Sequence, residues 1–152
     1  MFNIIESRKG IHNTRVLDLF AGTGNLGFEA ISRGASHVTS VDSSPESARL
    51  IKAGTKWFGI ESQVTFVQSD VDEFLEKYSP GSFDIIFADP PYDWPGIPGL
   101  PDRILNTSWL VEDGWLVIEH DARHSFVKDP RCVFAKPYGR TIVSIFPNDG
   151  GE

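Results

Sequence analysis

The sequence contains very little cysteine and no long hydrophobic run. Cys132 is its only cysteine, which excludes an internal disulfide and a paired-cysteine metal site and favours a reducing, cytoplasmic location. No apolar stretch approaches the ~20 residues that a membrane span needs, and the polar start MFNIIESRKG is unlike a secretory signal. The four histidines contain no HExxH motif, and His120 and His124, although four residues apart, are the only close pair, so we predict no metal site.

Positive charge is also in short supply. The chain has 14 Lys and Arg against 21 Asp and Glu, a net charge of −7, which argues against a general nucleic-acid coat protein. The imbalance lies in residues 34–122, where 15 acidic side chains face 5 basic ones, whereas both flanks are slightly positive. We therefore expect any polyanion to contact the ends of the sequence. The alternative is that these charges merely solvate the surface.

Apolar runs alternate with helical patterns along most of the 152 residues, without repeats or a linker, so we predict a single domain over 1–152. Strands are expected at 15–20, 37–42, 63–68, 83–88 and 114–119, and helices at 25–33, 45–58, 72–78 and 101–109. Strands this apolar, alternating with helices, are typical of a mostly parallel sheet that is covered on both faces. The last two strands, 131–136 and 140–146, are separated only by Pro137-Tyr138-Gly139, so we predict an antiparallel hairpin there. The fold class is α/β with seven strands.

A glycine-rich loop follows the first strand. Gly22, Gly24 and Gly27 satisfy the GxGxxG pattern, and Asp42 ends the second strand 18 residues after Gly24. Glycines let a cofactor approach the backbone, and an acid at that strand end can bind ribose hydroxyls. The pattern alone fits an NAD-type oxidoreductase as well as other nucleotide binders. Asp18, four residues before the first glycine, would repel a pyrophosphate but suits the sulfonium and amino groups of S-adenosylmethionine.

The fourth strand, FDIIFA, is followed at once by Asp89, Pro90, Pro91 and Tyr92. In a doubly wound sheet this strand ends at the crevice where ligands bind. An exocyclic base amine is a poor nucleophile because its lone pair is delocalised into the ring. The Asp89 carboxylate and the Pro90 carbonyl, held rigidly by the prolines, can accept its hydrogens and free that lone pair. Tyr92 offers a ring on which an extruded base can stack.

These segments together resemble the RsmD-type methyltransferases, which methylate guanine N2 in small-subunit ribosomal RNA. The resemblance runs nearly end to end, through VLDLFAGTGNLGFEAISRGA (16–35), FDIIFADPPY (83–92), LVEDGWLVIEH (110–120) and the late Tyr-Gly at 138–139. It implies a Rossmann-like class I fold, S-adenosylmethionine as cofactor, and ribosomal RNA or a small-subunit assembly particle as partner of a monomeric, cytoplasmic enzyme.

The resemblance also implies roles for individual residues. Asp89, Pro90, Pro91 and Tyr92 are expected to be catalytic. Cofactor contacts are expected at Asp18, Phe20, Ala21, Gly22, Gly24, Asn25, Asp42, Ser43, Asp70 and Val71. Asp70 would lie near the adenine, although it is equally suited to cap the following helix. Family members carry an arginine-containing segment before the stretch that starts here at Met1-Phe2. We therefore expect this chain to lack that arm, to bind cofactor weakly and RNA very weakly, and to methylate little or nothing.

Other interpretations remain open. The glycine pattern alone supports an NAD-type oxidoreductase, and the expected lack of the arm supports a cofactor-binding fragment without activity. A protein methyltransferase acting on glutamine amides can use a related Asn/Asp-Pro-Pro-Tyr motif. A cytosine-C5 enzyme is disfavoured because it needs a nucleophilic cysteine, and Cys132 lies in a predicted tail strand.

Overall fold

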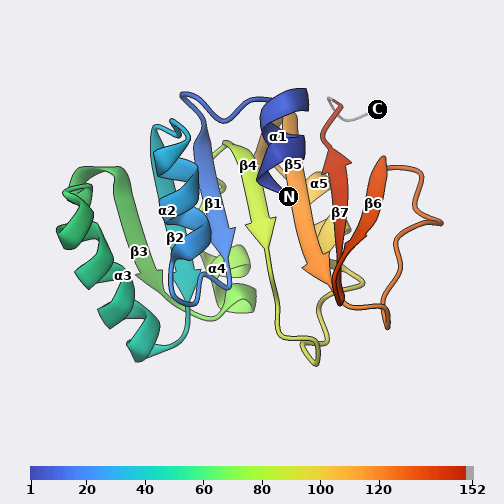
Figure 1. The fold of residues 1–152 in the computed structure, drawn as a ribbon. Helices are drawn as coiled ribbons and strands as arrows, with labels where there is room; N and C mark the ends of the chain where they lie inside the picture. The colour runs from blue at the N-terminus through green and yellow to red at the C-terminus, as the bar shows by residue number, and fades with distance from the viewer. Residues whose placement is uncertain (150–152) are drawn as a thin grey trace. The chain divides into compact units, whose positions relative to one another are not determined.

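A computed structural model describes residues 1–149, in which seven strands and five α-helices are distributed over two units, Met1–Lys77 and Tyr78 onward (Figure 1). In the first unit the elements are α1 (Phe2–Arg8), β1 (Arg15–Leu19), α2 (Asn25–Ser32), β2 (His37–Asp42), α3 (Pro45–Phe58), the short 3-10 helix η1 (Glu61–Gln63), β3 (Val64–Gln68) and α4 (Val71–Lys77). Its strands are parallel in the order β3-β2-β1.

Helices cover both faces of this three-stranded part. In Figure 1, α2 and α3 lie in front of β1, β2 and β3, and α4 lies behind them. The limits of α3 follow from local chemistry. The Ser44 hydroxyl accepts the Glu46 and Ser47 N–H groups, Pro45 occupies the first turn, and Gly59 ends the helix in the left-handed conformation (φ 68°). Each of these is a standard helix-terminus signal.

The second unit contains β4 (Phe83–Ala88), α5 (Leu100–Leu105), β5 (Leu110–His120), β6 (Phe134–Tyr138) and β7 (Thr141–Pro147). β4 and β5 are parallel, whereas β7 is antiparallel to both β5 and β6, which gives the order β4-β5-β7-β6. Phe87 and Phe146 are the largest of its fully buried side chains. The predicted hairpin is therefore present.

Three predicted boundaries were wrong. The helix expected at 101–109 ends at Leu105. The strand expected at 131–136 is β6, Phe134–Tyr138, so Pro137 and Tyr138 lie within the strand and the turn falls at Gly139 and Arg140. The strand expected at 114–119 begins four residues earlier, at Leu110. Pro137 is tolerated because β6 is the last strand in the order and needs a ladder donor on one side only.

Within residues 1–149 no helix has both the length and the apolarity that crossing a membrane would require.

Candidate active site

The glycine loop joins β1 to α2 and has an unusual backbone. Phe20 (φ 65°), Gly22 (φ 57°) and Gly24 (φ 85°) all adopt left-handed conformations, which glycine accepts without strain and phenylalanine does not. A Cβ on Gly24 would lie 2.7 Å from the Ile51 side chain, so that position requires glycine for space as well. Ala21 is buried, whereas Asn25, the first residue of α2, is exposed.

Asp42, at the end of β2, fixes the shape of this loop. Its Oδ2 accepts the Gly22 N–H at 2.8 Å, and its Oδ1 accepts the Ser44 N–H at 2.9 Å. Each carboxylate oxygen can accept a second hydrogen bond, so these contacts are compatible with the predicted contact to a ribose. They also give Asp42 a structural role that the sequence pattern did not indicate. Ser43, between Asp42 and the α3 cap, is exposed.

The other two predicted cofactor acids have different surroundings. Asp18 is fully buried in β1, opposite Ser40 of β2 in the strand register. Asp70 is exposed, and its Oδ1 accepts the Glu73 N–H at 2.7 Å. Asp70 therefore caps α4, which was the alternative interpretation. Its predicted place near an adenine stays a prediction, as does a contact from the buried Val71.

In the second unit, the Asp89–Tyr92 segment leaves the buried end of β4. Ala88 is 1% exposed, and Asp89 is exposed immediately after it. The Pro91 carbonyl accepts the Trp94 N–H at 2.9 Å and so belongs to the turn, which leaves the Pro90 carbonyl as the candidate acceptor beside Asp89. Tyr92 is 60% exposed, so part of its side chain is accessible to a planar ligand.

An arginine from the loop after β5 lies against that ring. The Arg123 guanidinium carbon is 4.3 Å from the Tyr92 ring centroid, well within cation–π range. Asp121 holds this arginine, because its Oδ2 accepts the Arg123 Nε–H and its Oδ1 accepts the Arg123 backbone N–H, both at 3.0 Å. These bonds lower the pKa of Asp121, so the carboxylate remains charged.

A second carboxylate accompanies Asp89. β4 and β5 pair in parallel with Ala88 opposite Ile118, so Asp89 and Glu119, each one residue further on, follow neighbouring strand positions. Loss of solvent raises the pKa of Asp89. Burial raises the pKa of Glu119, and the charge of Asp89 raises it further. No sequence motif indicates Glu119, because the strand register, and not the sequence spacing, brings it near Asp89.

The residues now placed define two chemical surfaces. The first unit offers a tight glycine loop tied to an acidic strand end, which suits a nucleoside with hydroxyl groups. The second offers two carboxylates, a proline carbonyl and an exposed aromatic ring, which suit a planar group that donates hydrogen bonds. Among the described residues 1–149, no group of three or more His, Cys, Asp or Glu could hold a metal ion.

The parallel, helix-covered strands of the first unit, and the mixed strands of the second with their terminal antiparallel pair, are those of the class I, Rossmann-like methyltransferase fold, which solved methyltransferase structures share. Residues 1–147 match the model of the family described as "Conserved hypothetical protein 95". The chain belongs to this family.

Relatives with curated names agree with this membership. The chain is 34% identical over 142 residues to the "Putative rRNA methyltransferase YlbH" of Bacillus subtilis, covering 90% of this chain and 77% of that protein. It is 32% identical over 119 residues to the "Ribosomal RNA small subunit methyltransferase D" of Buchnera aphidicola, covering 78% of this chain and 62% of that protein.

Solved structures give the same fold. A conserved hypothetical protein of Streptococcus pyogenes superposes with a TM-score of 0.87 at 28% identity, covering 99% of this chain and 94% of that one. An RNA methyltransferase from Salinibacter ruber, in complex with S-adenosyl-L-homocysteine, superposes with a TM-score of 0.75 at 13% identity, covering 98% and 90%. This second likeness concerns the fold alone.

Proposed function

We propose that this protein transfers a methyl group from S-adenosylmethionine to an exocyclic amine of a nucleobase, guanine N2 in small-subunit ribosomal RNA. The observation that carries the proposal is the Asp89–Tyr92 segment, which places a carboxylate, a proline carbonyl and an open aromatic ring at the carboxyl end of a buried strand. The names of two relatives point to ribosomal RNA as the substrate class.

The reaction needs the amine nitrogen to attack the methyl carbon on sulfur. Asp89 and the Pro90 carbonyl accept the amine hydrogens, which localises the lone pair on nitrogen, and S-adenosylhomocysteine leaves as a neutral thioether. Asp89 can take the proton that the amine loses. Tyr92 holds the plane of the base by stacking, which is worth about 1–3 kcal/mol for a base on an aromatic ring.

S-adenosylmethionine is supported by the first unit. The Asp42 carboxylate accepts the Gly22 N–H of the glycine loop. Its remaining lone pairs can still accept hydrogen bonds from ribose hydroxyls. The fully buried Asp18 carboxyl lies in β1, the strand that leads into this loop, and we assign it to the cationic groups of S-adenosylmethionine, since a carboxylate there would repel a pyrophosphate. Calorimetric titration with S-adenosylhomocysteine and with NAD separates these two cofactor classes, and we expect heat of binding with the first only.

The methyl-transfer step is tested by Asp89→Ala. We expect the variant to bind S-adenosylhomocysteine within a few-fold of the wild type, because Asp89 is assigned to the amine. Incorporation of radioactive methyl into 16S ribosomal RNA should fall by about 100-fold or more, the scale of losing one positioned general base. Asp93→Ala, an exposed acid in the same loop, is the matched control and should keep its activity. Substantial turnover by Asp89→Ala at saturating cofactor would contradict the assignment.

A further inference from the structure

Glu119 occupies a defined place beside the proposed amine-binding group. It is the penultimate residue of β5, and β5 is held on both sides, by β4 in parallel and by β7 in the opposite direction. Glu119 pairs with Val143 of β7. On the other side, the register that sets Ala88 beside Ile118 brings Asp89 to the level of Glu119. Asp89 lies one residue beyond the end of β4, and its charge reaches Glu119, because it raises the pKa of that carboxyl.

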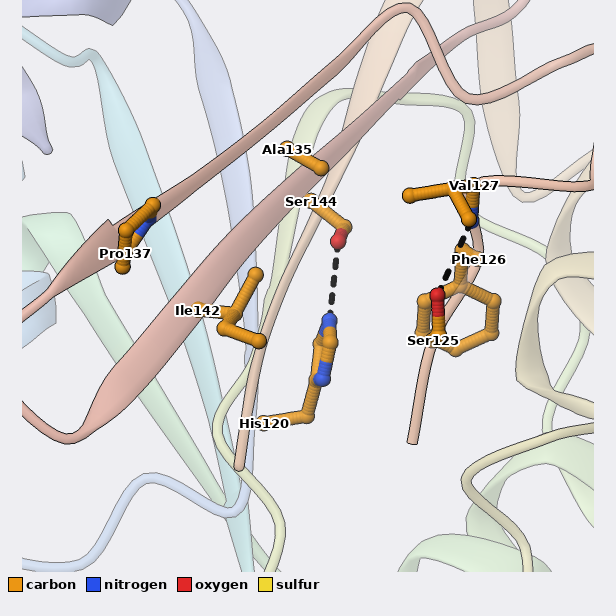
Figure 2. Close-up of a pocket in the computed structure, with 8 residues that line it drawn as sticks. All are labelled: His120, Ser125, Phe126, Val127, Ala135, Pro137, Ile142 and Ser144. Atoms are coloured by element: carbon orange, nitrogen blue, oxygen red, sulfur yellow. Dashed lines mark hydrogen bonds between the residues drawn. The ribbon is translucent and has the colours of Figure 1, made fainter. Parts of the chain in front are cut away.

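The next residue, His120, fixes which face Glu119 uses. His120 lines a cavity of about 180 Å³ together with residues of β6, β7 and the loop at 125–127, and Figure 2 shows its ring pointing toward Ser144. Its Nδ1–H donates to the Asp121 carbonyl at 3.0 Å, so its Nε2 accepts the Ser144 hydroxyl at 2.8 Å. The ring also meets the Phe126 ring edge-on. Side chains alternate between the two faces along a strand. Glu119, which precedes His120, therefore projects from the face of the strand opposite to His120.

The surroundings of both carboxyl groups make their charged forms costly. Burial and the nearby charge of Asp89 both raise the pKa of Glu119, and loss of solvent raises that of Asp89. Two such groups are acceptors when ionised. A ligand with two adjacent N–H donors would give each carboxylate a hydrogen bond. A ligand with one donor would leave the second carboxylate without a hydrogen bond, or beside a lone pair that repels it.

The nucleobases with exocyclic amines differ in this respect. Adenine N6 and cytosine N4 each stand beside a ring nitrogen that bears a lone pair. Guanine N2 alone stands beside a ring N–H, at N1. Only guanine therefore presents two neighbouring donors on the edge that an extruded base offers to a protein.

We infer that Glu119 is a specificity-determining residue, whose carboxylate accepts the N1–H of a target guanine while Asp89 accepts a hydrogen of its N2 amine. This inference rests on the proposed function and deepens it. The Glu119 carboxylate admits guanine and rejects adenine and cytosine, because it repels the lone pair that those bases carry beside their amine. A site built to bond a donor in this way discriminates strongly against analogues that lack it.

2-Aminopurine tests this inference directly. It carries the same 2-amine as guanine, but its N1 is an acceptor. The substrate is a 16S ribosomal RNA fragment whose methylated guanine has been located by mass spectrometry, prepared with guanosine or with 2-aminopurine riboside at that position. We expect wild-type kcat/KM to favour guanine by about ten- to a hundredfold, the worth of one hydrogen bond to a charged group.

Glu119→Gln should bring this ratio close to one, because a glutamine amide can donate to N1 of 2-aminopurine or accept from N1 of guanine. Glu112→Gln, an exposed acid on the same strand, should keep the wild-type ratio. An unchanged ratio in Glu119→Gln, with guanine still methylated, overturns the role of Glu119 and leaves the proposed function standing. If the wild type binds S-adenosylhomocysteine but methylates no base, the proposed function is wrong and the role of Glu119 falls with it.

Folding of the variant is checked by its thermal melt. If Glu119→Gln lacks a cooperative melt, Glu119→Asp takes its place, since it retains the carboxylate on a shorter stem. That variant should be slower but should still prefer guanine over 2-aminopurine. Equal rates on the two bases in a folded Glu119→Asp would overturn the inference.

Discussion

At the scale of single residues, Asp42 does two things with one carboxylate. It accepts the backbone N–H groups of Gly22 and Ser44, and we expect it to accept ribose hydroxyls as well. Asp42→Ala should therefore weaken binding of S-adenosylhomocysteine by about tenfold or more, since hydrogen bonds to a charged group are worth roughly 1.5–3 kcal/mol. Calorimetry measures this loss. Glu61→Ala, which removes an exposed acid from η1, is the control, and an unchanged dissociation constant for Asp42→Ala would contradict the assignment.

Glu119 should reduce stability at neutral pH. Its folded-state pKa is raised above the ordinary 4.5 by burial and by Asp89, so the folded protein binds this proton more tightly than the unfolded chain does. The cost is present when pH exceeds the folded pKa, and it disappears as pH falls below the unfolded value. Glu119→Gln should thus melt up to a few degrees higher than wild type at pH 8, with the difference shrinking toward pH 4. A constant difference across that range would exclude this electrostatic cause.

Motif residues could be predicted from the sequence because they are contiguous. Asp89–Tyr92 and the glycine loop each lie within one short stretch, and the structure places both at the carboxyl ends of their strands. Glu119 and Arg123 are some 30 residues from Asp89 and Tyr92, and only the strand pairing and the loop after β5 bring them together. A signal was present: the apolar strand 114–118 ends in Glu-His, at the end of the sheet where ligands bind.

At the scale of elements, the mispredicted boundaries have long-range causes. The start of β5 contains Val-Glu-Asp-Gly, which is typical of a turn, and Asp113 does adopt a positive φ of 67°. The strand nevertheless includes Asp113, because Asn148 pairs with this segment. The Asn148 side-chain amide donates to the Leu110 and Val111 carbonyls. The Asn148 carbonyl accepts the Asp113 N–H, and the Asn148 N–H donates to the Gly114 carbonyl. The start of β6 is delayed for a related reason: the Asp129 carboxylate accepts the Arg131 N–H, which holds Arg131 in a turn.

The loop after β5 should assist substrate binding through Arg123. Its guanidinium carbon lies over the Tyr92 ring, and arginine side chains and aromatic rings both stack on unpaired bases. We expect Arg123→Ala to raise KM for ribosomal RNA several-fold while kcat changes little, because the residue lies beside the base-stacking ring and not at the amine. Lys56→Ala, which removes an exposed cation from α3, is the control. A fall in KM would show instead that Arg123 competes with the base for the Tyr92 face.

At the scale of the whole molecule, a net charge of −7 opposes binding to a polyanion, so the few available cations should matter. The basic side chains after residue 122 are Arg123, Lys128, Arg131, Lys136 and Arg140. Arg131 is bound to Asp129 and Asp102, and Arg123 is bound to Asp121. Within residues 1–149, Lys128 and Arg140 are exposed and form no ion pair, whereas Lys136 lies over the Tyr138 ring. Lys128 and Arg140 are therefore the candidates for contact with phosphates.

Salt dependence measures how many phosphates the protein contacts, because each contact releases counterions and adds about 0.7 to the slope of log K against log salt for single-stranded nucleic acid. We expect Lys128→Gln with Arg140→Gln to lower affinity for 16S ribosomal RNA and to reduce that slope by about 1.4 in filter binding from low to physiological salt. Lys52→Gln with Lys56→Gln, which removes the same charge from exposed positions on α3, should lower affinity less and leave the slope unchanged. If both pairs change the slope equally, RNA responds to net charge alone and no phosphate-binding surface exists at the C-terminal end of the chain.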